Sequence, residues 1–430
     1  MRITRTLVPF SLVITCLWNT TWCQPRMTDL EQKRAQALLR DIARDVRNHY
    51  YDPKFHGLDW DAKVRETQQR IDHASSGNKA LSEIAALLDS LDDSHTVLIP
   101  PPPGVLHEYG WEALLIGEHC YVTRVRPGSD AEAKGLKAGD EILGINGYAP
   151  TRKTFEKITY FFDWLHPQPS LRLALRDSAG RERTLNIAAE IVERRRALED
   201  YFSASGEIRA KVRNMDLANV RPREVEMGDR LLIVKFAHFN FNEWKIDSLI
   251  SSARKHEALI LDMRGNGGGS EDTLKYLLGG VFEKEVRIGD LARRYGHESF
   301  VAKSHGHCFT GRLIVLVNSR SASAAELFAR VVQLEKRGTI LGDISAGRVM
   351  RGRFYDYDGI GASITDADLI MTDGKSLERV GVTPDELILP TTSDLEFGRD
   401  PVLAHAAETL GVKLTPEDAG KLFPYEWPLY

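Results

Sequence analysis

A serine-rich segment around residue 323 has the setting of a nucleophile turn. Residues 321–326 follow the apolar run 313–317, which is typical of a buried strand. The residues after the segment are apolar at helical spacing: Leu327, Phe328, Val331 and Val332. The pattern therefore predicts Ser323 at the start of a helix, where unpaired backbone N–H groups and the helix dipole stabilise an oxyanion. A serine-rich helix cap is the alternative interpretation.

A glycine loop at residues 262–269 lies between a predicted strand and a predicted helix. One interpretation is a dinucleotide-binding loop. Ser270 stands where the third glycine of that motif would be, and no acidic ribose partner follows clearly. The other interpretation is a loop whose bare N–H groups bind a transient oxyanion or a peptide strand, because close backbone approach needs glycine. A tight turn alone explains two of these glycines more easily than four.

The N-terminal part of the chain reads as a small helical region. Thr28 and Glu31 form a predicted capping box for a first helix. Further helices are expected at about 60–71 and 80–91. The acidic and polar segment 92–96, which contains Ser94 and His95, ends the region, and Pro100 to Pro103 predict a stiff linker.

The block 104–193 resembles a PDZ domain. The resemblance lies in two adjoining segments, 128–136 and 139–147, which read as a short helix closed by glycine and then a strand with a tight turn. PDZ domains add an extended peptide to a sheet edge and hold its carboxylate on backbone N–H groups. The resemblance places that loop at Tyr109, Gly110 and Trp111. A domain that only packs against its neighbour is the alternative.

From residue 229 onward, predicted strands alternate with predicted helices. Strands are expected at 231–236, 258–262 and 313–317, with another beginning at 339, and a helix is expected at 271–282. This order predicts an α/β core.

Three ordered segments of this core, 259–269, 315–326 and 381–385, are similar to the C-terminal processing, or tail-specific, serine peptidases. The PDZ-like block in front of them is similar to the PDZ domain of that family. The resemblance implies a crotonase/ClpP-like core with Ser323 as nucleophile. It implies an oxyanion hole formed by the N–H of Ala324 and that of Gly269 or Gly268.

One position departs from the Ser–Lys branch of the family. Where that branch carries its lysine base, this sequence has Arg348, and arginine stays protonated in proteins. The tricorn-type branch instead uses a histidine preceded by serine, with a distant glutamate. Resemblance to that branch implies His95 as the base, oriented by Ser94 and Glu378. The alternatives are a capping or surface histidine and a solvated loop carboxylate.

The bulk properties bound the remaining possibilities. The net charge of the 430 residues is -4 with both signs mixed, which gives no electrostatic case for nucleic acid. Residues 1–23 read as a secretory signal peptide, with Cys16 as a weak lipidation candidate, and no later segment reads as a membrane span. Cys120 and Cys308 allow one disulfide without implying it. The His305, His307 and Cys308 cluster lacks complementary ligands, so no metal is expected.

The sequence therefore predicts an exported serine endopeptidase, periplasmic or extracellular, that needs no cofactor. Its partners would be peptides or unfolded proteins. The predicted organisation is a signal peptide at 1–23, a helical region at 24–99, a PDZ domain at 104–193, a peptidase core at 194–395 and a C-terminal tail at 396–430. The rival hypothesis is a non-catalytic peptide- or ligand-binding protein that retains the peptidase fold.

Overall fold

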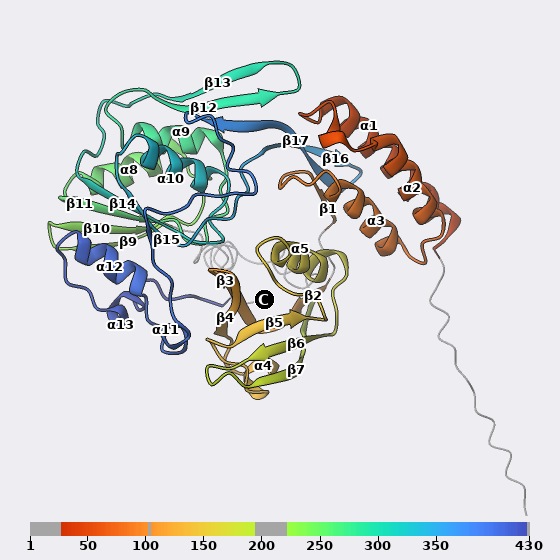
Figure 1. Cartoon of the computed structure of the whole chain (residues 1–430), viewed down its shortest axis with the longest axis horizontal. Helices are drawn as coiled ribbons and strands as arrows, with labels where there is room; N and C mark the ends of the chain where they lie inside the picture. The colour runs from red at the N-terminus through yellow and green to blue at the C-terminus, as the bar shows by residue number, and fades with distance from the viewer. Residues whose placement is uncertain (1–26, 102–104, 194–221, 428–430) are drawn as a thin grey trace, which may run out of the picture.

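The computed structural model describes residues 27–101, 105–193 and 222–427. The predicted signal peptide and Cys16 lie outside these residues. Figure 1 shows three bodies: N-terminal helices on the right, a small strand-rich domain below, and an α/β core on the left. The predicted fold class, with helices first, then a PDZ domain, then an α/β core, is confirmed in this arrangement.

The N-terminal helices are α1 (Asp29–His49), α2 (Trp60–Asp72) and α3 (Gly77–Asp89), with the short η1 (Phe55–Gly57) between the first two. The predicted capping box is present: Thr28 accepts from the Glu31 N–H, and the Glu31 carboxylate accepts from the Thr28 N–H. Apolar residues at helical spacing on α1, such as Leu39, Ile42 and Val46, are fully buried. Their burial fixes this region as one helical packing unit.

A five-stranded sheet joins the N-terminal helices to the core. Its strands are β1 (Val97–Ile99), β12 (Val286–Arg293), β13 (His297–Ala302), β16 (Arg351–Tyr357) and β17 (Ile360–Met371). β1 pairs antiparallel with β17, so that Val97 lies opposite Ser363 and Ile99 opposite Gly361. This pairing carries the segment just before β1, with Ser94 and His95, onto the core.

The PDZ domain is a five-stranded antiparallel sheet in the order β3 (Trp111–Ile116), β4 (His119–Val125), β5 (Glu141–Ile145), β6 (Ser170–Arg176) and β7 (Glu182–Ala188). The helix α5 (Phe155–Tyr160) continues directly into the π-helical turn η2 (Phe161–Leu165), and α4 (Asp130–Ala133) caps the far side. A separate pair joins β2 (Val105–Glu108) to β8 (Glu190–Glu193). β3 is an edge strand, which is the feature that peptide addition requires.

The α/β core has a six-stranded sheet in the order β18 (Glu386–Leu387), β15 (Thr339–Gly342), β14 (Arg312–Val317), β11 (Ala258–Asp262), β10 (Leu231–Lys235) and β9 (Arg223–Met227). All neighbours are parallel except β9. β11 is buried along its whole length, as expected for a strand covered on both faces.

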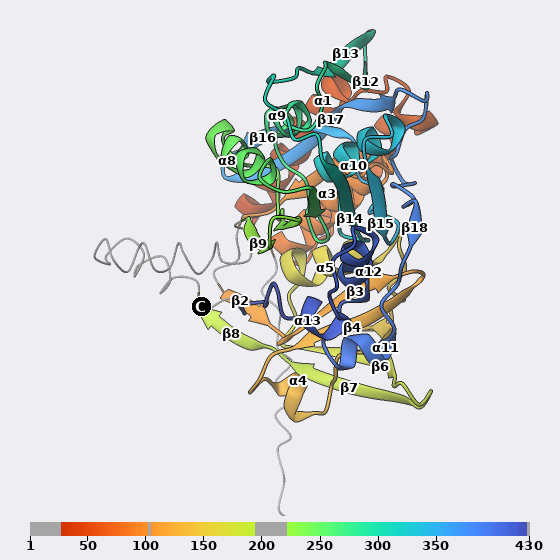
Figure 2. The same cartoon turned by 90° about the vertical axis from the view of Figure 1, so that its left-hand side faces the viewer.

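Helices cover both faces of this sheet, as Figure 2 shows for α8, α10 and α12. The helices α8 (Glu243–Ala253), α9 (Glu271–Gly279) and α10 (Ala324–Leu334) share one apolar cluster with the sheet, and α12 (Pro401–Thr409) and α13 (Pro416–Ala419) share another. The short α11 (Thr392–Glu396) precedes α12. Successive residues of β10 alternate between the two clusters, which is the period of a strand.

The predicted ends of two helices differ from those in the structure. The predicted helix at 271–282 ends at Gly279, and the helix predicted at 80–91 begins at Gly77, where Ser76 caps it. Within the described residues, none of the helices has the length and apolarity to cross a membrane. Cys120 and Cys308 are free thiols, and Cys120 is buried.

Candidate active site

Ser323 sits in a strained turn between β14 and α10. Its φ of 55° and ψ of -121° are unusual for a residue with a side chain, and such strain is concentrated at functional sites. The residue is half-buried. Its Oγ faces the Glu326 N–H in a capping box but donates no hydrogen bond to the described residues. The hydroxyl is therefore available for another role.

The glycine loop lies directly against this turn. A Cβ added at Gly268 would lie 2.6 Å from the Ser323 Cβ and 3.0 Å from the Ala324 nitrogen, so only glycine allows the approach. Within the described chain, the N–H groups of Ala324 and Gly269 donate no hydrogen bond, whereas the Gly268 N–H donates to Asn266 Oδ1 at 2.8 Å. Of the two predicted glycine donors, Gly269 is the one with a free N–H.

Ser94, His95 and Glu378 form one hydrogen-bonded chain. Ser94 Oγ donates to Glu378 Oε2 at 2.8 Å and lies 2.8 Å from His95 Nδ1. Because the single hydroxyl proton of Ser94 goes to Glu378, Ser94 accepts from an Nδ1–H, and the lone pair of His95 is then on Nε2. That Nε2 makes no hydrogen bond with the described residues. Ser94 and Glu378, which are far apart in the sequence, thus fix His95 in the Nδ1–H tautomer, and this tautomer leaves Nε2 able to accept a proton.

Asp93 fixes the backbone that carries this histidine. Its Oδ1 accepts from the N–H groups of His95 (2.8 Å) and Thr96 (2.7 Å) and from the hydroxyl of Thr365 on β17 (2.6 Å). Asp93 is buried, so these bonds are shielded from water. These hydrogen bonds anchor the loop that carries His95 to β17, the strand with which β1 also pairs.

The dipeptide Arg348–Val349 touches both halves of the site. The Arg348 carbonyl accepts from the Ser323 N–H at 2.8 Å, and its guanidinium donates to the Ser94 carbonyl at 3.4 Å. The Val349 N–H donates to Glu378 Oε2 at 3.1 Å. The structure therefore brings the Ser323 turn and the Ser94–His95–Glu378 chain to one short segment, although no hydrogen bond joins Ser323 to His95.

The electrostatics favour a neutral imidazole. Burial, reinforced by the nearby Arg348 cation and opposed by Asp93, lowers the pKa of His95 to about 4. Burial also raises the pKa of Glu378, against its hydrogen bonds from Ser94 and Val349. At neutral pH, His95 is thus an acceptor rather than a cation.

Glu326 is a site residue that sequence reasoning missed. Its fully buried carboxylate accepts from Ser345 Oγ (2.6 Å) and from the N–H groups of Gly347 (2.7 Å), Arg348 (2.8 Å) and Ser323 (3.0 Å). Burial raises the pKa of Glu326 to about 7, against these four hydrogen bonds, which favour the charged form. The only sequence signal was a glutamate three residues after Ser323, which is equally typical of a surface capping box.

We expect Glu326→Gln to lower kcat/KM by about 100-fold. The amide NH2 of glutamine can only donate, so it would face backbone N–H groups that at present donate to the Glu326 carboxylate. The comparison is with Glu335→Gln, an exposed position at the end of the same helix. Hydrolysis of a fluorogenic peptide by both variants checks this. Equal activity of the two variants would mean that Glu326 does not position the Ser323 turn.

A large groove of about 1330 Å³ runs between the N-terminal helices, the PDZ domain and the core. Ser94 and Arg348 are in its lining, whereas Ser323 and His95 are not. The groove therefore reaches the neighbours of the candidate base and nucleophile.

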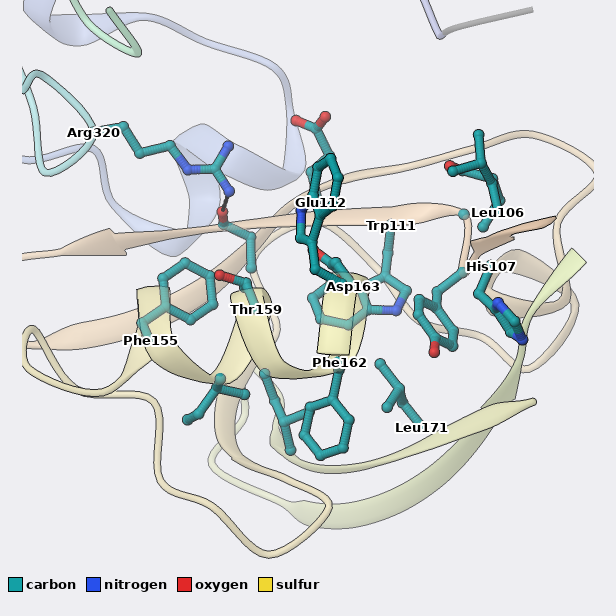
Figure 3. Close-up of a pocket in the computed structure, with 17 residues that line it drawn as sticks. Leu106, His107, Trp111, Glu112, Phe155, Thr159, Phe162, Asp163, Leu171 and Arg320 are labelled. Atoms are coloured by element: carbon teal, nitrogen blue, oxygen red, sulfur yellow. Dashed lines mark hydrogen bonds between the residues drawn. The ribbon is translucent and has the colours of Figure 1, made fainter. Parts of the chain in front are cut away.

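The predicted PDZ loop residues line a second cavity, of about 360 Å³. Gly110 has a φ of 71° and its carbonyl accepts from the Arg126 N–H, while the Tyr109 hydroxyl donates to the Gln168 carbonyl. Figure 3 shows Trp111 in the lining of this cavity, with Phe162 below it. The predicted loop, β3 and α5 thus line one and the same cavity.

No group of three or more metal-binding side chains occurs among the residues that the structure describes. The His305 ring lies against Tyr276 in a tilted contact, with ring centroids 3.8 Å apart and an interplanar angle of 41°. Of the cluster at 305–308, His305 thus makes an aromatic contact with α9.

Three protein-family models match the chain. Residues 230–388 match peptidase family S41, residues 106–160 match the PDZ domain, and residues 31–84 match the Tricorn protease C1 domain. The first covers β10 to β18 and contains Ser323, and the third falls on α1 to α3. The chain is a serine peptidase whose residues 230–388 match the S41 family model.

Curated relatives match the chain over most of their length. The chain is 25% identical to the chloroplastic C-terminal processing peptidase of Tetradesmus obliquus, over 84% of this chain and 79% of that protein. It is 24% identical to the carboxyl-terminal-processing protease of Synechocystis sp., over 82% and 81%. The solved photosystem II D1 C-terminal processing protease has the same fold, with a TM-score of 0.54 at 22% identity over 90% of this chain and 99% of that one.

Proposed function

We propose that this chain is an exported, tail-specific serine endopeptidase that cleaves peptides or unfolded proteins recruited through its PDZ domain. Ser323 is the nucleophile, His95 the base, and Ser94 with Glu378 orient the imidazole. The charged and apolar character of residues 1–23 supports export to the periplasm or the exterior. The names of the relatives, which process carboxyl termini, support the substrate class.

The observation that carries the proposal is the Glu378–Ser94–His95 chain, which leaves Nε2 unprotonated in a site that lacks the family lysine. A buried carboxylate at the end of such a chain stabilises the imidazolium that forms when the histidine takes a proton. A protein that only bound peptides would have no use for this ordered tautomer. The Glu378–Ser94–His95 chain therefore favours catalysis over the rival binding function.

The proposed reaction follows from these positions. His95 Nε2 accepts the proton of Ser323 as Oγ forms a bond to the scissile carbonyl carbon. The oxyanion is held by the N–H groups of Ala324 and Gly269 at the start of α10. The imidazolium then protonates the leaving amine, and water, deprotonated by the same nitrogen, hydrolyses the acyl ester at Ser323.

Incubation of the full chain with an unfolded protein, followed by mass spectrometry of the products, tests the proposal. Peptide-bond cleavage that proceeds without added metal and begins near the substrate's carboxyl terminus is the expected result. An inert chain that nevertheless binds the unfolded protein would establish the rival binding function.

Arg348→Lys should not improve activity, although it restores the residue of the Ser–Lys branch. The guanidinium donates to the Ser94 carbonyl and pairs with Glu156 Oε2 at 3.3 Å, and a single ammonium cannot reproduce this fork. We expect kcat/KM on a fluorogenic peptide to fall up to about tenfold. An inert wild type that becomes active in Arg348→Lys would show instead that the chain is a decayed Ser–Lys enzyme.

The pH profile should have an unusually low acid limb. A protonated imidazole cannot accept the serine proton, so activity is present above the pKa of His95 and is lost as the pH falls through about 4. The measurement is kcat/KM from pH 3.5 to 8, with circular dichroism at each pH to verify folding. A limb near 7 that disappears in Glu326→Gln would assign the ionisation to Glu326 instead.

A further inference from the structure

The glycine loop beside Ser323 must present one particular N–H to the oxyanion, and glycine alone does not fix that direction. Gly268 and Gly269 have φ values of 93° and 146°, a region that glycine enters readily and leaves as readily. A Cβ added at Gly267 would meet nothing within 4 Å, so packing does not hold the loop on that side. Hydrogen bonds from outside the three glycines must therefore hold their peptide planes.

Asn266 supplies the first of these hydrogen bonds from a fully buried side chain. Its Oδ1 accepts from the Gly268 N–H at 2.8 Å, and its Nδ2 donates at 2.8 Å to the carbonyl of Phe236, which directly follows β10. Its main-chain carbonyl accepts from the Ala322 N–H at 2.8 Å, one residue before Ser323. Asn266 thus joins the glycine loop, the end of β10 and the nucleophile turn at one point.

Phe239 holds the next peptide unit of the loop. Its N–H donates to the Gly268 carbonyl at 2.8 Å, and its carbonyl accepts from the Ser270 N–H at 2.7 Å. The peptide bonds of the described residues are all trans, so the Gly269 N–H points opposite to the Gly268 carbonyl and away from Phe239. With the N–H of Gly268 on Asn266 and its carbonyl on Phe239, the Gly269 N–H is the one left without an acceptor in the described chain.

The chemistry of the amide explains why residue 266 is an asparagine. The side chain must accept from one backbone N–H and donate to one backbone carbonyl at once, which an amide does and an ionised carboxylate cannot. A carboxylate would also place a negative charge one peptide unit from the Gly269 N–H. An apolar side chain would leave the Gly268 N–H and the Phe236 carbonyl without these partners, and the glycine peptide planes could then rotate to satisfy them.

We propose that Asn266 is a positioning residue of the oxyanion hole. Its amide turns the Gly268 N–H away from the substrate carbonyl, so that the Gly269 N–H is presented to the oxyanion beside that of Ala324. Its main-chain carbonyl keeps the Ser323 turn against the loop. The inference deepens the proposed function and rests on it. It requires the amide to matter for the tetrahedral state and not for the binding of the uncleaved peptide.

Inhibition of the full chain by a peptide aldehyde and by the matching peptide alcohol tests this inference. Both carry the four residues that precede the bond cleaved in the unfolded-protein digest. Ser323 Oγ bonds to the aldehyde carbon as its proton passes to His95, and the former carbonyl oxygen takes the place of the oxyanion. The alcohol has the same side chains and cannot form this bond.

In Asn266→Asp and Asn266→Ala, we expect the inhibition constant of the aldehyde to rise by about 100-fold, and that of the alcohol to change by less than about threefold. On a fluorogenic peptide, kcat should fall by about 100-fold at an almost unchanged KM. Asn186→Asp is the matched control, because it makes the same chemical change at an exposed position of β7 outside both cavities. It should leave every constant unchanged.

The pH dependence of the aspartate variant separates positioning from a loss of folded protein. When the carboxyl group introduced by Asn266→Asp is protonated, it can again both donate and accept. Its kcat relative to wild type should therefore rise as the pH falls from about 8 to about 5, since burial favours the neutral acid. Asn266→Ala has no group that titrates at this position and should show no such rise. Because it introduces no buried charge, it carries the test where the aspartate variant does not fold.

The outcomes separate this inference from the proposed function. If both Asn266 variants keep the wild-type ratio of the aldehyde and alcohol inhibition constants, or lose affinity for both inhibitors alike, Asn266 does not position the oxyanion hole and the serine mechanism stands. A wild type that cleaves no peptide, or that binds the aldehyde no more tightly than the alcohol, overturns the proposed function and this inference with it.

Discussion

Ser323→Ala is expected to abolish peptide-bond hydrolysis while the protein stays folded. The side chain sits at the strained turn before α10, beside the free N–H groups of Ala324 and Gly269, and its hydroxyl holds no other group. Loss of a serine nucleophile lowers kcat by roughly 10⁴-fold or more. Because Oγ donates no hydrogen bond in the described chain and only faces the Glu326 N–H of a capping box, the thermal midpoint should change little.

Cleavage of an unfolded protein by equal amounts of wild type, Ser323→Ala and Ser299→Ala measures this effect. Ser299 is exposed on β13, and its substitution should leave the rate unchanged. If Ser323→Ala turns over at the wild-type rate, the nucleophile has been assigned to the wrong residue.

The second large effect concerns His95. His95→Ala should lose nearly as much kcat as Ser323→Ala, and the double variant should lose little more, because a nucleophile and its base act as one unit. Ser94→Ala and Glu378→Ala should lose less, since these residues orient the ring without transferring the proton. Single-turnover rates on an activated ester give all four comparisons.

The matched control for this series is His73→Ala, an exposed histidine of the same N-terminal region whose Nδ1 hydrogen-bonds the Gln69 carbonyl of its own helix. Full activity in His95→Ala would refute the proposed base. Additive losses in the double variant would mean that Ser323 and His95 contribute independently, so that a different group takes the serine proton.

Sequence patterns predicted the elements whose formation is local. The capping box at Thr28, the buried strand β11 and the strand-to-helix turn at Ser323 follow from short-range periodicity and end signals, and all three are present. The resemblance to processing peptidases supplied the order of the parts. The predicted domain boundaries and catalytic roles stay predictions.

Long-range contacts could not be predicted in the same way. The β1–β17 pairing, which brings His95 to the core, depends on a register between segments more than two hundred residues apart, and no local pattern encodes it. Glu326 looked like a solvated helix cap and is instead fully buried among four donors. No sequence pattern singled out Arg320, because its hydrogen bond to the Ala113 carbonyl forms only where the core meets β3.

Labelling by a fluorophosphonate tests the central claim most directly, since the reagent modifies only a serine that a base activates. Wild type, His95→Ala and Ser323→Ala are treated in parallel, and the modified peptide is located by mass spectrometry. The account predicts a single adduct on Ser323 in the wild type, labelling slowed by roughly 10³-fold or more in His95→Ala, and none in Ser323→Ala. A wild type without an adduct, or equal labelling rates with and without His95, would contradict it.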